Sequence, residues 1–222
     1  MQELLIKQHQ LDYIGAFAKP AFVLWGESKS LFEGLYQAFA PAGVSLSDFR
    51  IEGNVEDPSS QSVKVFVGTN ATFRFRFDRI EATIQHFSAA ELGTLMNGLA
   101  AAGQWVRSAA PEFHFQSHLM GYSAHCELPG SSSTELLRAL GTPQLSVLGE
   151  SPGSGLIFHG EFQEPRRTIQ LTIDHSLVVQ HGLFVNFVAL INNTEIDYTS
   201  DQSQLMELFD QALGEIGLSR AQ

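Results

Sequence analysis

Apolar positions that recur about every 3.6 residues predict a long helix near the middle of the chain. The segment Ser88 to Glu91 is typical of a capping box, in which the serine accepts a hydrogen bond from a helix amide and the glutamate reaches back. Leu92, Leu95 and Leu99 then share one helical face. The pattern therefore predicts a helix from Ser88 to about residue 107.

Three further helices are indicated by the same signals. The segment Thr199 to Gln202 matches a capping box ahead of an apolar stripe over 205–216. A shorter helix is predicted after Ser28 or Ser30, running to Phe39, and another after Ser132. We expect the last helix of the chain to pack on a sheet.

Alternation of apolar and polar residues, with β-branched and aromatic side chains, is typical of strands in the remaining segments. Strands are predicted at Ala21–Trp25, Asp48–Gly53, Val63–Val67, Ala71–Phe77, Phe113–Cys126, Leu156–Gln163, Thr168–Asp174 and Leu183–Ile191.

This order of elements predicts an α+β fold of antiparallel sheets, each covered by helices. An N-terminal segment, 1–19, precedes two halves, 20–110 and 111–222, that repeat a similar order. The repetition favours a tandem duplication of a βαβββα-like unit. Few residues are identical between the halves, so a chance likeness, or one continuous domain, remains the alternative.

Composition limits the function classes. The 222 residues are 44% hydrophobic and 17% charged, which is typical of a globular chain that folds by burial. The net charge of −11 argues against a nucleic-acid partner, because phosphate backbones are bound by clustered lysine and arginine. No apolar run approaches the ~20 residues of a membrane span, and no signal peptide is recognisable. With a single cysteine, Cys126, these features predict a soluble cytoplasmic protein without a membrane partner.

Histidines and carboxylates in the second half suggest one candidate site. If the predicted strands are neighbours, alternation places His114, His159, Glu161 and Asp174 on one polar face, together with His118. Imidazoles and carboxylates bind zinc or iron, so a hydrolase or another metal-dependent enzyme is a hypothesis. The alternative is the ordinary polar outer face of a half-solvated sheet, with no cofactor.

Basic residues suggest a second candidate site. Arg74 and Arg76 alternate with phenylalanines, and Lys64 can join them on the polar face, which would suit a small anionic ligand. Cross-strand ion pairs with acidic residues are the alternative interpretation. Cys126 follows His125 directly, so the two side chains should point to opposite faces, and a buried thiol is expected rather than a nucleophile.

No phosphate-binding glycine loop, dinucleotide fingerprint, EF-hand or zincin helix occurs in the sequence. We therefore expect a non-catalytic protein-interaction or binding protein, a subunit or adaptor in a larger assembly. Its partner would be another protein or a second copy of the chain. The negative charge of the chain favours a partner with a basic surface.

Overall fold

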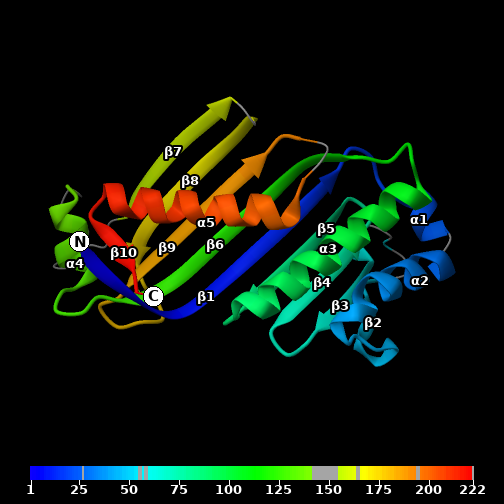
Figure 1. Cartoon of the computed structure of the whole chain (residues 1–222), viewed down its shortest axis with the longest axis horizontal. Coiled ribbons are helices and arrows are strands. Elements are labelled where there is room, and N and C mark those ends of the chain that lie inside the picture. The colour runs from blue at the N-terminus through cyan, green and yellow to red at the C-terminus, as the bar shows by residue number, and fades with distance from the viewer. Residues whose placement is uncertain are drawn as a thin grey trace. The chain divides into compact units, whose positions relative to one another are not determined.

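Figure 1 shows a computed structural model of the chain. The structure describes residues 1–26, 28–54, 57, 60–141, 155–163, 166–193 and 196–221. Within these ranges it contains ten strands and five α-helices, so the fold is mixed α+β. None of the helices in the described ranges has both the length and the apolar character to cross a membrane.

The chain begins with a long strand and two helices before the next strands. The elements up to residue 109 are β1 (Gln2–Phe17), α1 (Phe22–Gly26), α2 (Ser28–Phe39), the 3-10 turns η1 (Ala40–Ala42) and η2 (Leu46–Asp48), β2 (Phe49–Glu52), β3 (Ser62–Val67), β4 (Ala71–Arg76), β5 (Arg79–Gln85) and α3 (Ala89–Ala109). The elements that follow are β6 (Phe115–Glu127), α4 (Ser133–Ala139), β7 (Leu156–Gln163), β8 (Arg166–His175), β9 (Leu183–Ile191), α5 (Tyr198–Glu215) and β10 (Leu218–Arg220).

The described strands form a single ten-stranded sheet. Its order is β2-β3-β4-β5-β1-β6-β9-β8-β7, and β10 pairs with β1 off this path. The hairpins β2–β3, β3–β4, β4–β5 and β7–β8 are antiparallel, whereas β10 runs parallel to β1. The predicted α+β class is confirmed, with one large sheet in place of several. The covering of each sheet by helices and the duplication stay predictions.

Two compact units can be distinguished along the chain, and each is described by itself. The α3 unit comprises Leu11–Met120 and Leu190–Gln202, and the β7 unit comprises Met1–Gln10, Gly121–Ala189 and Ser203–Gln222. Strands β1, β6 and β9 and helix α5 contribute residues to both units. The sequence boundaries at 20–110 and 111–222 remain a prediction.

Two predicted capping boxes are confirmed. Ser88 accepts from the Glu91 amide while the Glu91 carboxylate accepts from the Ser88 amide, and α3 begins at the next residue. Ser132 and Glu135 cap α4 in the same way. The last helix is also present, but it begins at Tyr198, one residue before the predicted capping box. Asp197 caps it by accepting from the Ser200 amide at 3.0 Å.

The structure corrects the strand predictions in the first half. Ala21–Trp25 is predicted to be a strand, but α1 is helical there, where Trp25 stacks on Phe77 with ring centroids 4.6 Å apart. Strand β1 lies in the segment 1–19, for which no element is predicted, and β5 is also missed. In β1, buried Leu11, Tyr13 and Phe17 alternate with more exposed residues, so the strand signal is present in the sequence.

The core of the α3 unit lies between its helices and the strands β3 to β5. Phe39 at the end of α2 packs on Phe73 of β4 with ring centroids 4.8 Å apart, and both rings are fully buried. Gly98 of α3 allows this approach, because a Cβ there would lie 2.4 Å from the Phe39 ring. The contact between α2 and α3 therefore depends on a position without a side chain.

The core of the β7 unit gathers around Phe209 of α5. Phe187 of β9 and Tyr122 of β6 pack on this ring at centroid distances of 5.6 and 5.2 Å. The Arg220 guanidinium lies 5.6 Å from the Phe209 centroid and donates two hydrogen bonds to the Asp210 carboxylate. These contacts fix α5 against β6 and β9.

Replacing Gly98 with alanine should destabilise the fold. The added methyl group meets a buried ring that cannot move freely, so we expect the free energy of unfolding to fall by about 1–3 kcal/mol. Gly93→Ala is the matched control, because a Cβ there meets nothing within 4 Å. This control should be neutral or more stable by up to about 1 kcal/mol. Urea unfolding followed by circular dichroism measures both, and equal effects would contradict the described packing.

Candidate functional site

An open apolar groove lies beside α5 in the β7 unit. It encloses about 570 Å³ between one side of α5 and the strands β7, β8 and β9. The side chains and backbone that line it belong to Phe158, His159, Gly160, Phe162, Ile169, Leu171, Phe187, Leu208, Gln211, Ala212, Glu215 and Ile216. We call this feature the α5 groove.

The floor of the groove comes from the register of the β7–β8 hairpin. Phe158 is paired with Leu171, and Gly160 with Ile169, so alternate residues of both strands face the same side. Leu171 and Ile169 are buried, whereas Phe158 and Phe162 are 42% and 39% exposed. Two partly exposed aromatic rings therefore lie on one face of β7, at the groove.

The helical wall of the groove contains one acidic residue, Glu215. Helix α5 carries Asp201, Glu207, Asp210 and Glu215 and contains no lysine or arginine. Asp210 is neutralised by Arg220, whereas Glu215 lines the groove itself. The rim of the groove near Glu215 therefore favours positive charge on whatever binds there.

Arg167 of β8 contacts Phe162 at the other end of the floor. Its guanidinium lies 5.0 Å from the centroid of the Phe162 ring and donates to the side chain of Gln204 at 3.4 Å. This cation–π contact orients Phe162 along the strand.

Helix α4 reaches a different part of the same sheet. Ser133 at its start lies 2.8 Å from His175, oxygen to Nδ1, and His175 is the last residue of β8. Ile169 and Leu171, which line the groove, are four to six residues away along β8. The position of α4 therefore leaves this part of the β8 face to α5 and the groove.

The predicted histidine and carboxylate residues are only partly brought together. His159 and Glu161 lie two residues apart on the exposed strand β7. His159 pairs with Gln170 in the register, so Asp174, four residues further along β8, is roughly 13 Å away. His114 lies before β6 in the α3 unit, where its Nδ1 is 3.3 Å from the Glu112 carbonyl oxygen.

The described part of the chain contains no cluster of three or more His, Cys, Asp or Glu side chains placed to hold a metal ion. The catalytic interpretation of His114, His159, Glu161 and Asp174 stays a hypothesis. What the described geometry offers at this edge is one imidazole and one carboxylate on an exposed strand.

His118 corrects the expectation that it lies on a polar outer face. Its ring is fully buried in the α3 unit, and Nδ1 lies 2.7 Å from the hydroxyl of Tyr13. Tyr13 in turn donates to the Tyr198 hydroxyl at 3.3 Å. Burial, and then the neighbouring Tyr198, raise the pKa of Tyr13 well above its ordinary value, so its hydroxyl stays protonated. No local sequence pattern predicts this network, because its members are far apart along the chain.

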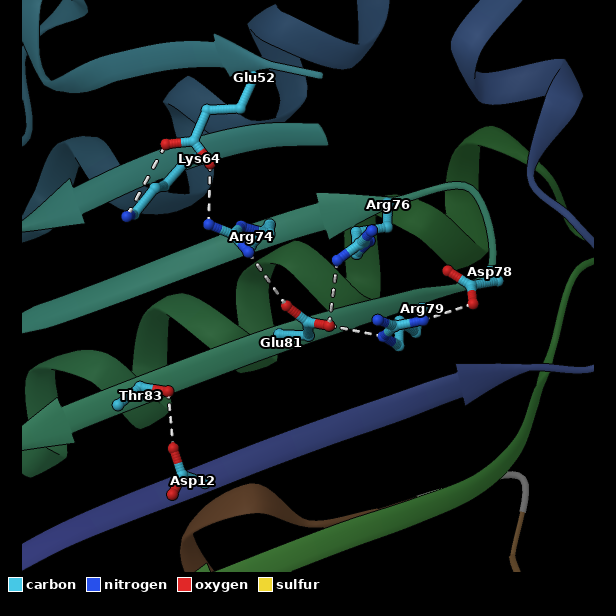
Figure 2. Close-up of polar contacts among 9 residues, drawn as sticks. All are labelled: Asp12, Glu52, Lys64, Arg74, Arg76, Asp78, Arg79, Glu81 and Thr83. Carbon is cyan, nitrogen blue, oxygen red and sulfur yellow. Dashed lines mark hydrogen bonds and ion pairs between the residues drawn. The ribbon is translucent and has the colours of Figure 1, made fainter. Parts of the chain in front are cut away.

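The predicted basic site is a ladder of ion pairs, which Figure 2 shows. Glu52 of β2 accepts from Arg74 of β4 at 2.8 Å and lies 3.8 Å from the Lys64 nitrogen. Glu81 of β5 lies 3.8 Å from both Arg74 and Arg76. Lys64 and Arg74 are directly opposite in the register, so the carboxylate between them offsets a repulsion between like charges. Carboxylates thus occupy positions that a bound anion would take, and anion binding by these residues remains a prediction.

Cys126 is buried in β6, where burial raises the pKa of its thiol to about 12. His125 next to it faces elsewhere, and its Nδ1 lies 2.9 Å from the Ser176 hydroxyl. The thiol is thus protonated near neutral pH, as a side chain of the core.

Comparison with known proteins does not assign this site. No protein-family model matches the chain. Curated proteins likewise contain no match to it. The functional argument therefore depends on the groove and on the residues around it.

Replacing Glu81 with glutamine should destabilise the ion-pair ladder. Three guanidinium groups, those of Arg74, Arg76 and Arg79, lose a shared carboxylate. We expect the free energy of unfolding to fall by about 1–2 kcal/mol. Glu33→Gln, which removes an exposed i,i+4 pair with Lys29, should change it by less than about 0.5 kcal/mol.

Urea unfolding with and without added phosphate measures both effects of Glu81→Gln. If the basic side chains can hold an anion, phosphate restores the variant more than it stabilises the unchanged protein. An unchanged unfolding midpoint for Glu81→Gln would contradict the ladder.

Cys126 should not react with a disulfide reagent in the folded protein. With a pKa of about 12, its thiolate fraction at pH 8 is about 10⁻⁴. We expect labelling by Ellman's reagent only after unfolding in guanidinium, whereas a Gln180→Cys variant, exposed in a turn, reacts at once. Rapid labelling of native Cys126 would contradict its burial.

Proposed function

We propose that this protein is a non-catalytic binding protein that holds an amphipathic helix of a partner protein in the α5 groove. The observation that carries the proposal is the open apolar floor formed by Phe158, Phe162, Ile169 and Leu171 beside α5. Phe158 and Phe162 are 42% and 39% exposed, so burial of the remaining surface would contribute roughly 1 kcal/mol for each ring. A partner in the micromolar range is compatible with such a surface.

The α3 unit supports a helix as the occupant. Its α2, of 12 residues, packs against α3 and on β4 through Phe39, Phe73 and Gly98. In the β7 unit, α4 has only seven residues and lies at the His175 end of β8. A helix from a partner would therefore take, beside α5, the kind of place that α2 takes beside α3.

A tandem duplication supports the same interpretation, and we infer it from strand order. From the centre of the sheet outward, the order is β1, β5, β4, β3, β2 on one side and β6, β9, β8, β7 on the other. In each series the strand that comes first in the sequence is central, and the strand that comes last in the sequence lies next to it. In this scheme α4, seven residues long within the described residues, is the shortened counterpart of α2.

Charge favours a partner helix with basic flanks. The chain carries a net charge of −11, and Glu215 lines the groove on a helix that contains no lysine or arginine. At low salt, a basic helix would bind with a higher association rate constant and a higher affinity than a neutral one. The role of a subunit or adaptor follows from such binding.

Binding of designed peptides tests the proposal. We expect a helical peptide of about 18 residues, with leucines on one face and lysines on the other, to bind with a micromolar dissociation constant. A peptide with glutamates in place of the lysines should bind at least about tenfold more weakly. Fluorescence anisotropy of the labelled peptides measures both constants.

A variant of the groove wall distinguishes binding of the peptide in the groove from general electrostatic attraction to the acidic protein. Ala212→Arg adds a bulky positive charge in the groove and should weaken the basic peptide at least about tenfold. Gln180→Arg adds the same charge on an exposed turn outside the groove and should have little effect. Equal loss in both variants, or equal binding of both peptides, would overturn the proposal.

A further inference from the structure

Strand β7 presents a long open edge. It is the last strand in the sheet order, and among the described residues only β8 pairs with it. It spans Leu156–Gln163, contains no lysine or proline, and exposes Ile157, Phe158 and Phe162. Natural edge strands are usually protected by lysines, prolines or bulges, so an edge of eight residues with exposed apolar side chains and neither lysine nor proline is suited to pairing with another strand.

The sequence of β7 is nearly symmetric about Gly160. Phe158 and Phe162 flank it at two residues on either side, and His159 and Glu161 at one. Alternation puts both phenylalanines on the groove side with Gly160, and the histidine and glutamate on the opposite side. Such a strand is complementary to a second copy of itself.

We propose that two copies of this chain pair antiparallel through β7, with the twofold axis at Gly160. Phe158 of each copy then lies opposite Phe162 of the other, and His159 lies opposite Glu161 of the other copy. Every such pair occurs twice, as a twofold interface requires. Aromatic pairs are favourable across antiparallel strands, and an imidazole N–H can donate a hydrogen bond to a carboxylate that lies opposite it.

Neighbouring registers lack this complementarity. Moving the axis by one residue to Glu161 sets that carboxylate opposite itself, and moving it to His159 sets two imidazoles opposite each other. Either shift also removes the pairing between Phe158 and Phe162. The register at Gly160 is therefore the one that matches both faces of the strand.

Gly160 leaves space at the axis. A Cβ at this position meets nothing within 4 Å, so the two backbones can approach and the phenylalanines can cover the gap. His159 and Glu161 are exposed in the single chain, so pairing changes their surroundings more than those of the core.

This inference goes beyond the proposed function, because it concerns the edge of β7 and not the helix partner of α5. The two can fail separately. Ala212→Arg changes the α5 wall and should leave self-association intact, whereas exchange of His159 and Glu161 alters the edge.

Charge exchange at the edge tests the proposed register by sedimentation velocity. We expect the unchanged chain to form a dimer in the micromolar range, and His159→Glu or Glu161→His to raise the dissociation constant at least about tenfold by opposing like groups. The double variant H159E/E161H restores the opposite pairs and should regain the dimer. Circular dichroism verifies that each variant is folded.

Cross-linking gives an independent test of the axis. Gly160→Cys places two thiols opposite each other, so mild oxidation should yield a covalent dimer. Gln163→Cys is the matched control, because its two copies would be about 20 Å apart in this register. Buried Cys126 should not contribute to the product.

A chain that stays monomeric up to about 100 μM would overturn the proposal. So would single variants that dimerise as well as the unchanged chain, or a double variant that does not recover. Equal cross-linking of G160C and Q163C would show that contact occurs without the proposed register, and would also overturn it.

Discussion

The structure depends on covering the apolar face that alternation creates along each strand. In the α3 unit, α2 and α3 pack on this face. The two helices approach closely because Gly98 has no side chain and the Phe39 ring occupies the space. In the β7 unit Phe209 of α5 meets the same need at β6 and β9. The floor at Phe158 and Phe162 is left partly exposed, and both proposals follow from that difference.

A second constraint concerns polar groups placed within the core. His118 is fully buried, and its imidazole is held by the Tyr13 hydroxyl, which also contacts Tyr198. A buried polar group without such a bond costs roughly 1–3 kcal/mol, so the three side chains specify one arrangement of β1, β6 and the start of α5. On the outer face, Arg74 and Glu81 likewise pair with groups of opposite charge in the ion-pair ladder. Each of these pairs contributes less free energy, because solvent screens the charges.

Local signals in the sequence were sufficient for the helices and for most strands of the second half. Ser88 and Ser132 act through neighbours three residues away, so their caps can be read without the fold. The helix at Trp25 could not, because its contact with Phe77 is made by tertiary packing. The strand order could not be predicted either, because no local sequence signal indicates that β1 pairs with β6. For the site, His159 and Glu161 were noticed as possible ligands, but the groove needs Leu171 and Ala212, whose apolar character is ordinary until the fold unites them.

The hydrogen bond between Tyr13 and Tyr198 has a consequence for how the chain is made. These residues are separated by 185 positions, and both belong to the α3 unit. A ribosome adds roughly 5–20 residues per second, so Tyr198 is synthesised on the order of 10–40 s after Tyr13. During that interval the α3 unit lacks the piece that closes its interior, although most of its residues have already emerged. Nascent chains therefore pass through a stage in which Tyr13 and His118 are present and the contact with Tyr198 is still missing.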